Sequence, residues 1–353
     1  MSVLLFLISL TLTMSKPGIN FSCKDPNNNI VDWYLIMLLP VSSHPEKKLV
    51  YMYYDQETGP NQYDFDEKTF PPIRDTHEVD GMTPKDKVNY FFWNDDTSTE
   101  DKLSAAYKGK AHSKGGLVYN KDGGYFLMHS LPRFPRRTAN NEFVDTLPDN
   151  AGIYAQHFLC ITANLENNLK IVDTLNIINP QIIINNGDKD NVGESESVIK
   201  LIKNRFDQKL PSFKIFDVES IGKKKFTFFS RSKNEENLQF DYHIPDYYKD
   251  DFYVETWSKP TLMDPICDGL YKVMNVKALK FGNYSFDNGQ EHAKWSVAAK
   301  KDITCFGDLN RTDQKTVRGG NVICIKDKKL AKLMRNAITD RDKCMEAEFL
   351  FLE

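Results

Sequence analysis

A His-x-Lys tripeptide occurs twice in this chain of 353 residues, and this repeat constrains the fold more than any other feature of the sequence. We call His112–Lys114 the first copy and His292–Lys294 the second copy, and 180 positions separate their histidines. Alternate side chains of an extended segment lie on one face, so each histidine is expected beside its lysine. A repeat at this distance predicts two similar halves that form one composite site.

The residues around each copy have the pattern of a β-hairpin. The first copy predicts strands at Ala111–Tyr119 and Tyr125–Ser130, joined by a turn at Asn120–Gly124. The second copy predicts extended segments at His292–Val297 and Ile303–Phe306, with a polar segment between them. A single His-x-Lys has little specificity, but two copies with matched following segments are much harder to obtain by chance.

Two histidines and two lysines are the side chains that hydrolysis of a phosphodiester needs. If His112 and His292 meet across a pseudo-two-fold interface, one neutral imidazole attacks phosphorus and forms a phosphohistidine. The other imidazole, protonated, donates to the departing ester oxygen, and water then hydrolyses the intermediate. Lys114 and Lys294 are expected to hold the non-bridging oxygens. This chemistry requires no metal ion and no other cofactor.

Small polar residues end each predicted hairpin at a matched distance from its lysine. Ser130 lies 16 residues after Lys114, and Asn310 lies 16 residues after Lys294. The residues expected to orient the imidazoles or to donate hydrogen bonds to phosphate are His129, Ser130, Asp308 and Asn310. His129 equally suits a buried hydrogen-bonding role.

The other histidines have no comparable sequence context. His44, His77, His157 and His243 are therefore interpreted as structural or surface residues. Trp295 follows Lys294 directly, and we expect it to pack in the core rather than to stack on a nucleobase.

Coarser patterns indicate how the chain is organised. The first half, to about residue 180, contains aromatic and β-branched runs such as Tyr51–Tyr54 and Tyr90–Trp93, which predict sheet. Apolar residues recur at helical spacing around Glu194–Asp207 and again at Lys328–Ile338. We place the junction between the two halves within residues 181–237.

Further motifs accompany both copies and carry a resemblance to a known family. They are Val31–Tyr34, Tyr51–Asp55, Trp93–Asp95, His112–Gly116, Gly124–Pro135, Gln156–Cys160, His292–Trp295, Cys305–Arg311 and Arg318–Cys324. With these motifs the chain resembles the deoxyribonuclease II family of acid deoxyribonucleases, which shares the two-motif plan of phospholipase D-like phosphodiesterases. The motifs span nearly the whole chain and are weakest between about residues 188 and 250.

The resemblance implies a fold and an activity. The expected fold is α/β and phospholipase D-like, with two pseudo-symmetric halves, residues 17–180 and 181–353, packed as one compact unit. Each half is expected to have a mixed β-sheet flanked by helices. The implied activity is an acid endodeoxyribonuclease that cleaves DNA without metal and leaves 3′-phosphate and 5′-hydroxyl ends.

The chain departs from the usual family pattern at three places. Ala111 stands where a glycine normally precedes the first histidine. Met37-Leu38 replaces a Tyr-Lys pair, and Ser296 occupies a position where cysteine often follows the tryptophan. None of these changes affects the histidines or lysines, so they bear on substrate preference and specific activity.

The N-terminus and the cysteines indicate an oxidising, secretory route. Residues Val3–Met14 form an uncharged apolar run that is too short to span a membrane, and residues 1–16 suit a signal peptide. No later stretch approaches membrane-spanning length. We therefore expect the protein in the lysosome or outside the cell.

The six cysteines form an even set, for which about 15 disulfide connectivities are possible. The family resemblance implies the pairs Cys23 with Cys160, Cys267 with Cys344, and Cys305 with Cys324. The glycosylation sequons at Asn283 and Asn20 are expected to be used, whereas the one at Asn310 overlaps the expected site and should stay bare.

The net charge fits a DNA substrate only at acid pH. A formal charge of −3 is unusual for a protein that binds a polyanion, but protonation of all seven histidines would bring it to +4. Two alternatives remain open. One is a secreted, catalytically weak relative that acts in DNA binding or host interaction, and the other is a phospholipase D-like lipid hydrolase. The sequence indicates no obligatory protein partner.

Overall fold

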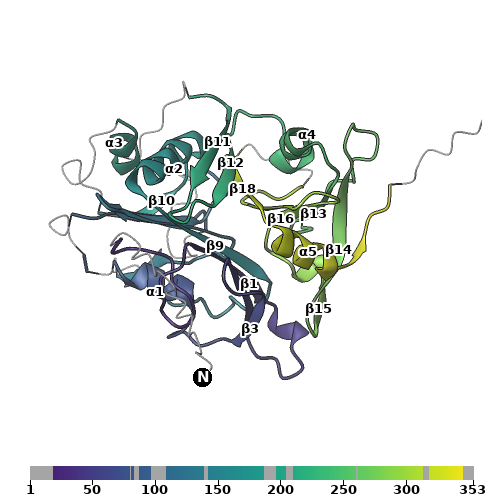
Figure 1. The fold of residues 1–353 in the computed structure, drawn as a ribbon, viewed down its shortest axis with the longest axis horizontal. Coiled ribbons are helices and arrows are strands. Elements are labelled where there is room, and N and C mark those ends of the chain that lie inside the picture. The colour runs from purple at the N-terminus through teal and green to yellow at the C-terminus, as the bar shows by residue number, and fades with distance from the viewer. Residues whose placement is uncertain are drawn as a thin grey trace, which may run out of the picture.

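Two large β-sheets form most of the regular structure in the computed structural model of the chain (Figure 1). The structure describes residues 19–79, 81–82, 87–96, 109–138, 142–186, 196–203, 210–259, 261–312 and 318–344. The expected signal peptide lies outside these residues. No helix within the described ranges has the length and apolar character needed to cross a membrane.

The first sheet has eight strands in the order β10-β4-β5-β6-β9-β1-β2-β3, and each neighbouring pair is antiparallel. Its strands are β1 (Trp33–Leu39), β2 (Val50–Asp55), β3 (Asn61–Asp64), β4 (Asn89–Trp93), β5 (Gly115–Asn120), β6 (Gly123–His129), β9 (Gln156–Ala163) and β10 (Ile182–Asn185). A separate two-stranded sheet pairs β7 (Arg136–Arg137) with β8 (Phe143–Val144).

The second sheet has nine strands, in the order β11-β12-β18-β17-β16-β13-β14-β15 with β19 beside β14. It is mixed, because β13 pairs parallel with β14 while the other pairs are antiparallel. Its strands are β11 (Phe213–Glu219), β12 (Lys225–Arg231), β13 (Phe252–Glu255), β14 (Val273–Phe281), β15 (Tyr284–Asp287), β16 (Trp295–Ala298), β17 (Ile303–Gly307), β18 (Gly320–Lys326) and β19 (Ile338–Arg341).

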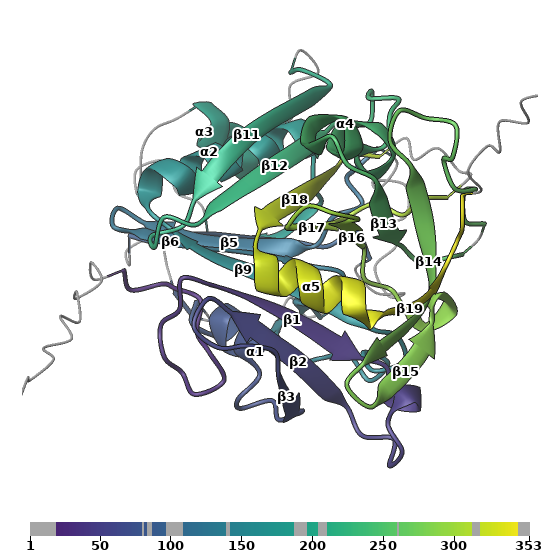
Figure 2. The same cartoon turned by 45° about the vertical axis from the view of Figure 1, so that its right-hand side comes forward.

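The helices lie on the faces of the sheets, as Figures 1 and 2 show. They are α1 (Pro71–His77), α2 (Leu165–Ile178), α3 (Glu196–Ile202), α4 (Ile244–Tyr248) and α5 (Lys328–Ala337), together with a π-helical turn at Gln239–His243 and 3-10 turns at Val41–Ser43 and Asn288–Gln290. The predicted α/β class is therefore confirmed, but the mixed sheet expected in each half is found only in the second, since every pair of the first sheet is antiparallel. The helix predicted at Lys328–Ile338 is α5, and α3 covers the described part of the one predicted at Glu194–Asp207.

The two sheets repeat one topological unit. In the first sheet, β4, β5, β6, β9 and β1 are neighbours in that order, and β9 leads into α2. In the second sheet, β13, β16, β17, β18 and β12 follow the same order, and β18 leads into α5. In each unit the hairpin that follows a His-x-Lys copy lies between β4 and β9 or between β13 and β18. The junction expected after residue 180 falls between α2 and β10, which still pairs with β4.

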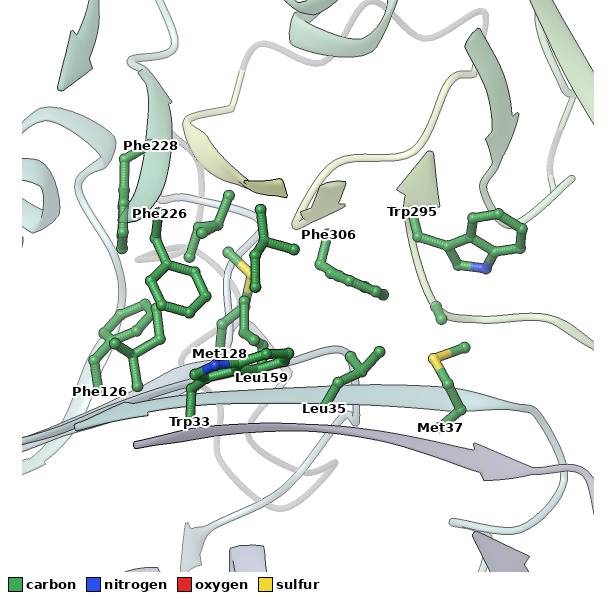
Figure 3. Close-up of a cluster of buried hydrophobic side chains, with 14 of the residues drawn as sticks. Trp33, Leu35, Met37, Phe126, Met128, Leu159, Phe226, Phe228, Trp295 and Phe306 are labelled. Carbon is green, nitrogen blue, oxygen red and sulfur yellow. The ribbon is translucent and has the colours of Figure 1, made fainter. Parts of the chain in front are cut away.

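Strand β1 shows how the sequence builds the core. Its seven residues are all buried, because both faces of the strand are covered. Trp33, Leu35 and Met37 pack into a cluster shared with the second sheet, α2 and α5. Figure 3 shows them opposite Phe226, Phe228, Trp295 and Phe306. The alternate residues Tyr34, Ile36 and Leu38 pack on the other face, in the cluster that includes α1 residue Ile73.

Capping residues of α2 and α5 join these helices to neighbouring segments of the chain. The side chain of Asn164 accepts a hydrogen bond from Asn167 N (3.0 Å) at the start of α2. Asn179 ends α2 in a left-handed conformation, and its carbonyl oxygen accepts from Ala111 N at 2.8 Å. Asp327 caps α5 and accepts from Tyr54 Oη (2.9 Å), which ties the second half to β2 of the first.

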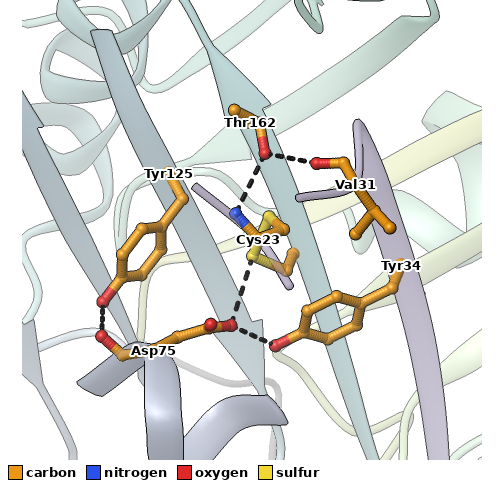
Figure 4. The surroundings of a disulfide bond; sticks show 7 residues. Cys23, Val31, Tyr34, Asp75, Tyr125 and Thr162 are labelled. Carbon is orange, nitrogen blue, oxygen red and sulfur yellow. Dashed lines mark hydrogen bonds between the residues drawn. A yellow bond between two sulfur atoms is a disulfide. The ribbon is translucent and has the colours of Figure 1, made fainter. Parts of the chain in front are cut away.

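Disulfides close the structure where the family resemblance implied. Cys23 is bonded to Cys160, Cys267 to Cys344 and Cys305 to Cys324. Figure 4 shows the first of these beside Thr162, Tyr34 and Asp75, where Cys23 N donates to Thr162 Oγ1 at 3.0 Å. This bridge holds the N-terminal segment against strand β9.

The segment interpreted as the junction between the halves contains three strands that were not predicted, β10, β11 and β12. Strand β12 is a central strand that pairs with both β11 and β18. The structure also corrects the position of the two copies. Both hairpins form as predicted, but each histidine lies before its first strand, β5 or β16, while the lysine carbonyl still accepts from the returning strand, at His129 N or Gly307 N.

Candidate active site

Each copy is anchored by backbone hydrogen bonds to the opposite half of the chain. His112 N donates to Gly319 O (2.9 Å), just before β18. His292 N donates to Ala155 O (2.9 Å), just before β9. For the two histidines these bonds replace the ladder that the sequence predicted, and they hold both copies against the opposite half.

The two imidazole rings are oriented across the same interface. His112 Nδ1 lies 2.7 Å from the backbone oxygen of Asp308. A carbonyl oxygen only accepts, so Nδ1 carries the proton and Nε2 keeps its lone pair. His292 Nδ1 lies 3.2 Å from Gln156 Oε1, which belongs to the first half. Each half therefore holds the ring of the other half through Nδ1.

The lysine of the first copy is neutralised by an ion pair. Lys114 is 4% exposed, and its Nζ donates to Asp95 Oδ1. Arg318 Nη2 lies 2.9 Å from Asp95 Oδ2, and His112 Nε2 lies 3.6 Å from the same oxygen. Burial alone would raise the pKa of Asp95, but Lys114, His112 and Arg318 together hold it well below its ordinary value.

The lysine of the second copy has no such neutralisation. Lys294 is 1% exposed, and its Nζ donates to His292 O at 2.6 Å and lies 3.4 Å from His292 Nδ1. Within the described ranges no carboxylate forms an ion pair with it. Burial, with the charge of Lys114 in addition, lowers the pKa of Lys294 to about 7.

The four side chains form one electrostatic cluster. Burial lowers the pKa of His112 to about 3, Asp95 opposes that shift, and the charges of Lys114 and Lys294 reinforce it. Burial holds the pKa of His292 well below its ordinary value, and Lys294, Lys114 and His112 all contribute. Lys294 acts on His112, and Lys114 and His112 act on His292, so electrostatic contact links the two halves at this cluster. The structure thus brings together all four residues singled out in the two copies.

The residues expected in supporting roles lie around this cluster and differ in how far their side chains are buried. Ser130 Oγ donates to Gln156 Oε1 at 2.6 Å, so it reaches the His292 ring through an amide. Asp308 is buried with a pKa raised by burial to about 7, and its Oδ2 accepts from Asn321 N at 2.7 Å. Asn310 is half-buried just after β17.

His129 lies behind the first copy. Its N donates to Lys114 O at 3.1 Å, and its ring stacks on Phe158 with centroids 5.4 Å apart. Burial lowers its pKa to about 3, so the ring is neutral. This is the geometry of a packed residue that supports Lys114.

Sequence reasoning did not assign a role to four of the groups in this cluster. They are Asp95, Arg318, Gln156 and the buried carboxylate Glu291. Asp95, Gln156 and Arg318 each lie in a motif that carried the family resemblance, and that was the available signal. Their spacing along the chain relative to the two copies has no local pattern, because they come from the ends of β4 and β9 and the segment before β18.

The remaining candidates fall away from the cluster or into the core. Trp295 is fully buried, as expected. His157 is also fully buried, and burial lowers its pKa well below its ordinary value, with contributions from Lys294 and His129. His44, His77 and His243 stack or pair elsewhere.

The departures from the family pattern are buried, and Ala111 directly precedes His112. Met37 and Leu38 point to the two sides of β1, and Ser296 lies opposite Cys305 in the β16–β17 hairpin. Asn283 and Asn20 are exposed.

Comparison with known proteins identifies the family. A family model described as deoxyribonuclease II matches residues 22–344, so the chain belongs to the deoxyribonuclease II family. It is 26% identical to plancitoxin-1 from Acanthaster planci over 98% of both chains. It is also 26% identical to human deoxyribonuclease-2-beta over 92% of this chain and 91% of that protein, and 23% identical to deoxyribonuclease-2 from Caenorhabditis elegans over 96% and 98%.

Proposed function

We propose that this chain is an acid endodeoxyribonuclease that hydrolyses DNA phosphodiester bonds through a phosphohistidine intermediate and leaves 3′-phosphate and 5′-hydroxyl ends. One observation carries the proposal. Two imidazoles from opposite halves, each with its Nδ1 engaged by the other half, share a buried cluster with two lysines. The names of the relatives, which include deoxyribonuclease-2 proteins, support DNA as the substrate.

The reaction proceeds in two displacements. Nε2 of one histidine attacks phosphorus and forms a P–N bond while the P–O5′ bond breaks. The second histidine, protonated, gives its proton to the departing 5′ oxygen. That histidine, now neutral, takes a proton from water as the water oxygen attacks phosphorus. The P–N bond then breaks, and the phosphate remains on the 3′ oxygen.

Lysine and arginine side chains supply the positive charge for these steps. The carboxylate of Asp95 contacts Lys114 and Arg318 and lies 3.6 Å from His112 Nε2, so it marks where an anionic oxygen is held in this cluster. Non-bridging phosphate oxygens are expected beside that position and at Lys294. Charge stabilisation by these cations requires no metal ion. The described residues include no group of three or more histidine, cysteine, aspartate or glutamate side chains arranged to hold one.

The titrating groups of the cluster account for an acidic optimum. Burial brings the pKa of Lys294 down to about 7 and raises the pKa values of Asp308 and Glu291 to about 7. As pH falls through 7, Lys294 gains its charge while the two carboxylates lose theirs. The site becomes more cationic, which favours a bound phosphate. The bound phosphate in turn favours the protonated form of the histidine that acts as acid.

Ser130 and Asp308 are assigned positioning roles. Ser130 fixes the Gln156 amide that holds His292, and the backbone of Asp308 holds His112. His129 supports Lys114 by packing, and Asn310, half-buried after β17, is the remaining candidate for a hydrogen bond to phosphate.

The disulfides indicate the cellular compartment. Three disulfides fit a protein of the secretory pathway. We further propose a signal peptide at residues 1–16, glycans at Asn283 and Asn20, and a final location in the lysosome or outside the cell. The repeated topology supports a phospholipase D-like division into residues 17–180 and 181–353.

A plasmid cleavage assay tests this function. Purified protein is incubated with plasmid DNA and excess EDTA at about pH 5 and at neutral pH. Cleavage should persist in EDTA, be faster at acid pH, and yield fragments that require phosphatase treatment before 3′ extension. Loss of cleavage on chelation with recovery on adding magnesium would overturn the mechanism.

A further inference from the structure

Two partly exposed aromatic side chains flank the second copy. Trp257 follows β13, and its ring lies 4.7 Å from the ring of His292 at an interplanar angle of 61°. Tyr154 precedes β9 and lies 5.6 Å from Trp257 and 6.1 Å from His292, centroid to centroid. The three rings form one group, to which each half of the chain contributes.

This group differs from the other tryptophans of the protein. The chain has four tryptophans, and Trp33, Trp93 and Trp295 are at most 1% exposed. Trp257 is partly exposed, although burial of an indole removes more apolar surface from water than burial of almost any other side chain. A large aromatic ring left partly open beside a histidine of the candidate active site therefore needs an explanation.

The indole Nε1 of Trp257 is buried and finds no acceptor among the described residues, as is also true of Nε1 in the core residues Trp33 and Trp295. A buried donor without a partner costs free energy unless something else accepts its hydrogen bond, and such groups are rare in folded proteins. Thr256 fixes the backbone here, because its Oγ1 accepts from Arg311 N at 3.1 Å.

The first copy has no equivalent group. The surroundings of His112 are the charged residues Asp95, Lys114 and Arg318, and no ring contact within the described ranges involves His112. A phosphodiester held between the two histidines would therefore have charged neighbours on one side and aromatic neighbours on the other.

We propose that Trp257 and Tyr154 form a stacking subsite for an unpaired nucleobase attached to the phosphate held at His292. The proposal rests on the function proposed above. Every base has an apolar face that stacks on an aromatic ring, so the subsite is tolerant of sequence. A base inside a duplex is covered by its neighbours, so the subsite takes a base that has left the stack.

A binding experiment with a catalytically inactive variant tests the stacking subsite. The full chain carrying His112→Ala, which blocks turnover, is titrated with a single-stranded thymidine octanucleotide and with an octanucleotide of equal length whose central residues are abasic. Because three tryptophans are buried, quenching of intrinsic fluorescence reports Trp257. We expect the thymidine strand to quench the emission and the abasic strand to leave it unchanged.

Substitutions separate stacking from mere support of the His292 ring. In the His112→Ala background, with affinity measured by the fluorescence anisotropy of end-labelled strands, Trp257→Leu should weaken binding of the thymidine strand about tenfold and leave binding of the abasic strand unchanged. Tyr154→Leu should act in the same direction. The matched control Trp257→Phe removes the fluorescence signal but keeps a ring, so its affinity should stay within about threefold of the parent.

Two outcomes would overturn the subsite: equal affinity for the two strands in the parent, or equal weakening of both strands by Trp257→Leu. Failure of the proposed function would look different. In that case the chain without substitutions would not cleave DNA, whatever the result of the fluorescence titration.

Discussion

The two His-x-Lys copies occupy equivalent places in two repeated units but differ in their electrostatics. Lys114 is neutralised by Asp95, which also pairs with Arg318. Lys294 is more deeply buried and donates to a backbone carbonyl instead. The lysine of the first copy therefore has its counter-charge within the protein. The lysine of the second copy forms no ion pair among the described residues, and a bound phosphate can supply that negative charge. The comparison shows that a symmetric fold can give two like motifs unequal tasks.

The largest expected effect is on DNA cleavage and comes from substitution of either histidine, since the two are equally important. His112→Ala and His292→Ala should each lower DNA cleavage by roughly a thousandfold or more, because nucleophile and acid act in one displacement. The double variant should be little worse than either single one, and circular dichroism should show an intact fold. If either single variant keeps substantial activity, the two histidines do not form one site.

Substitution of either lysine should lower the rate of DNA cleavage by a similar factor. The two substitutions should change the free energy of unfolding in opposite directions. Lys114→Met and Lys294→Met should each cost roughly 10- to 150-fold in rate, the equivalent of one charge-assisted hydrogen bond. Lys114→Met also leaves the buried Asp95 with one partner fewer, which should cost about 1 to 3 kcal/mol of stability.

Lys294→Met should instead stabilise the fold, since it removes a buried cation that forms no ion pair within the described residues, although Asp95, Glu291 and Asp308 favour its charge. The pKa of Lys294 falls from its ordinary value of 10.5 to about 7, so its cost to folding is greatest below pH 7 and declines as pH rises from 7 toward 10.5. Urea titrations at about pH 5 and pH 9 measure this difference. Equal destabilisation by the two lysine substitutions would remove the electrostatic contrast between the copies.

A smaller effect is expected on the alkaline side of the pH profile. Lys294 is protonated below a pKa of about 7 and loses its charge above it, so activity should decline as pH rises through 7. Arginine keeps its charge throughout this range. Lys294→Arg should therefore raise the ratio of activity at pH 8 to activity at pH 5 by about tenfold, whatever its absolute rate. Lys114→Arg serves as the control, and an unchanged ratio in Lys294→Arg would assign the alkaline limb to another group.

Local patterns predicted much of this molecule. The hairpins β5–β6 and β16–β17, helix α5 and the buried Trp295 all follow from periodicity or turn residues within a few positions. The disulfide pairs followed from the family resemblance, since six cysteines alone leave their pairing open. Strands β11 and β12 were missed, because charged residues interrupt Phe213–Glu219 and the segment was interpreted as a junction.

The partners of the site residues were beyond sequence reasoning for a physical reason. Asp95 meets Arg318, and His112 meets Asp308, across separations of about two hundred residues, so only the packing of the two sheets brings them together. The position of each copy was wrong in the same way. A His-x-Lys next to a strand pattern predicts a strand, but the backbone N–H groups of His112 and His292 bond to Gly319 and Ala155 of the opposite halves instead.

The central claim, that the two copies act on one phosphate, is tested most directly by trapping the covalent intermediate. Protein turning over DNA at acid pH is quenched with base, under which phosphohistidine survives, and is digested for mass spectrometry. The account predicts one phosphoryl group per chain, on His112 or His292, that accumulates in one histidine→Ala variant and is absent from the other. A phosphoryl group on another residue, or cleavage by the chain with no phosphohistidine at either position, would contradict it.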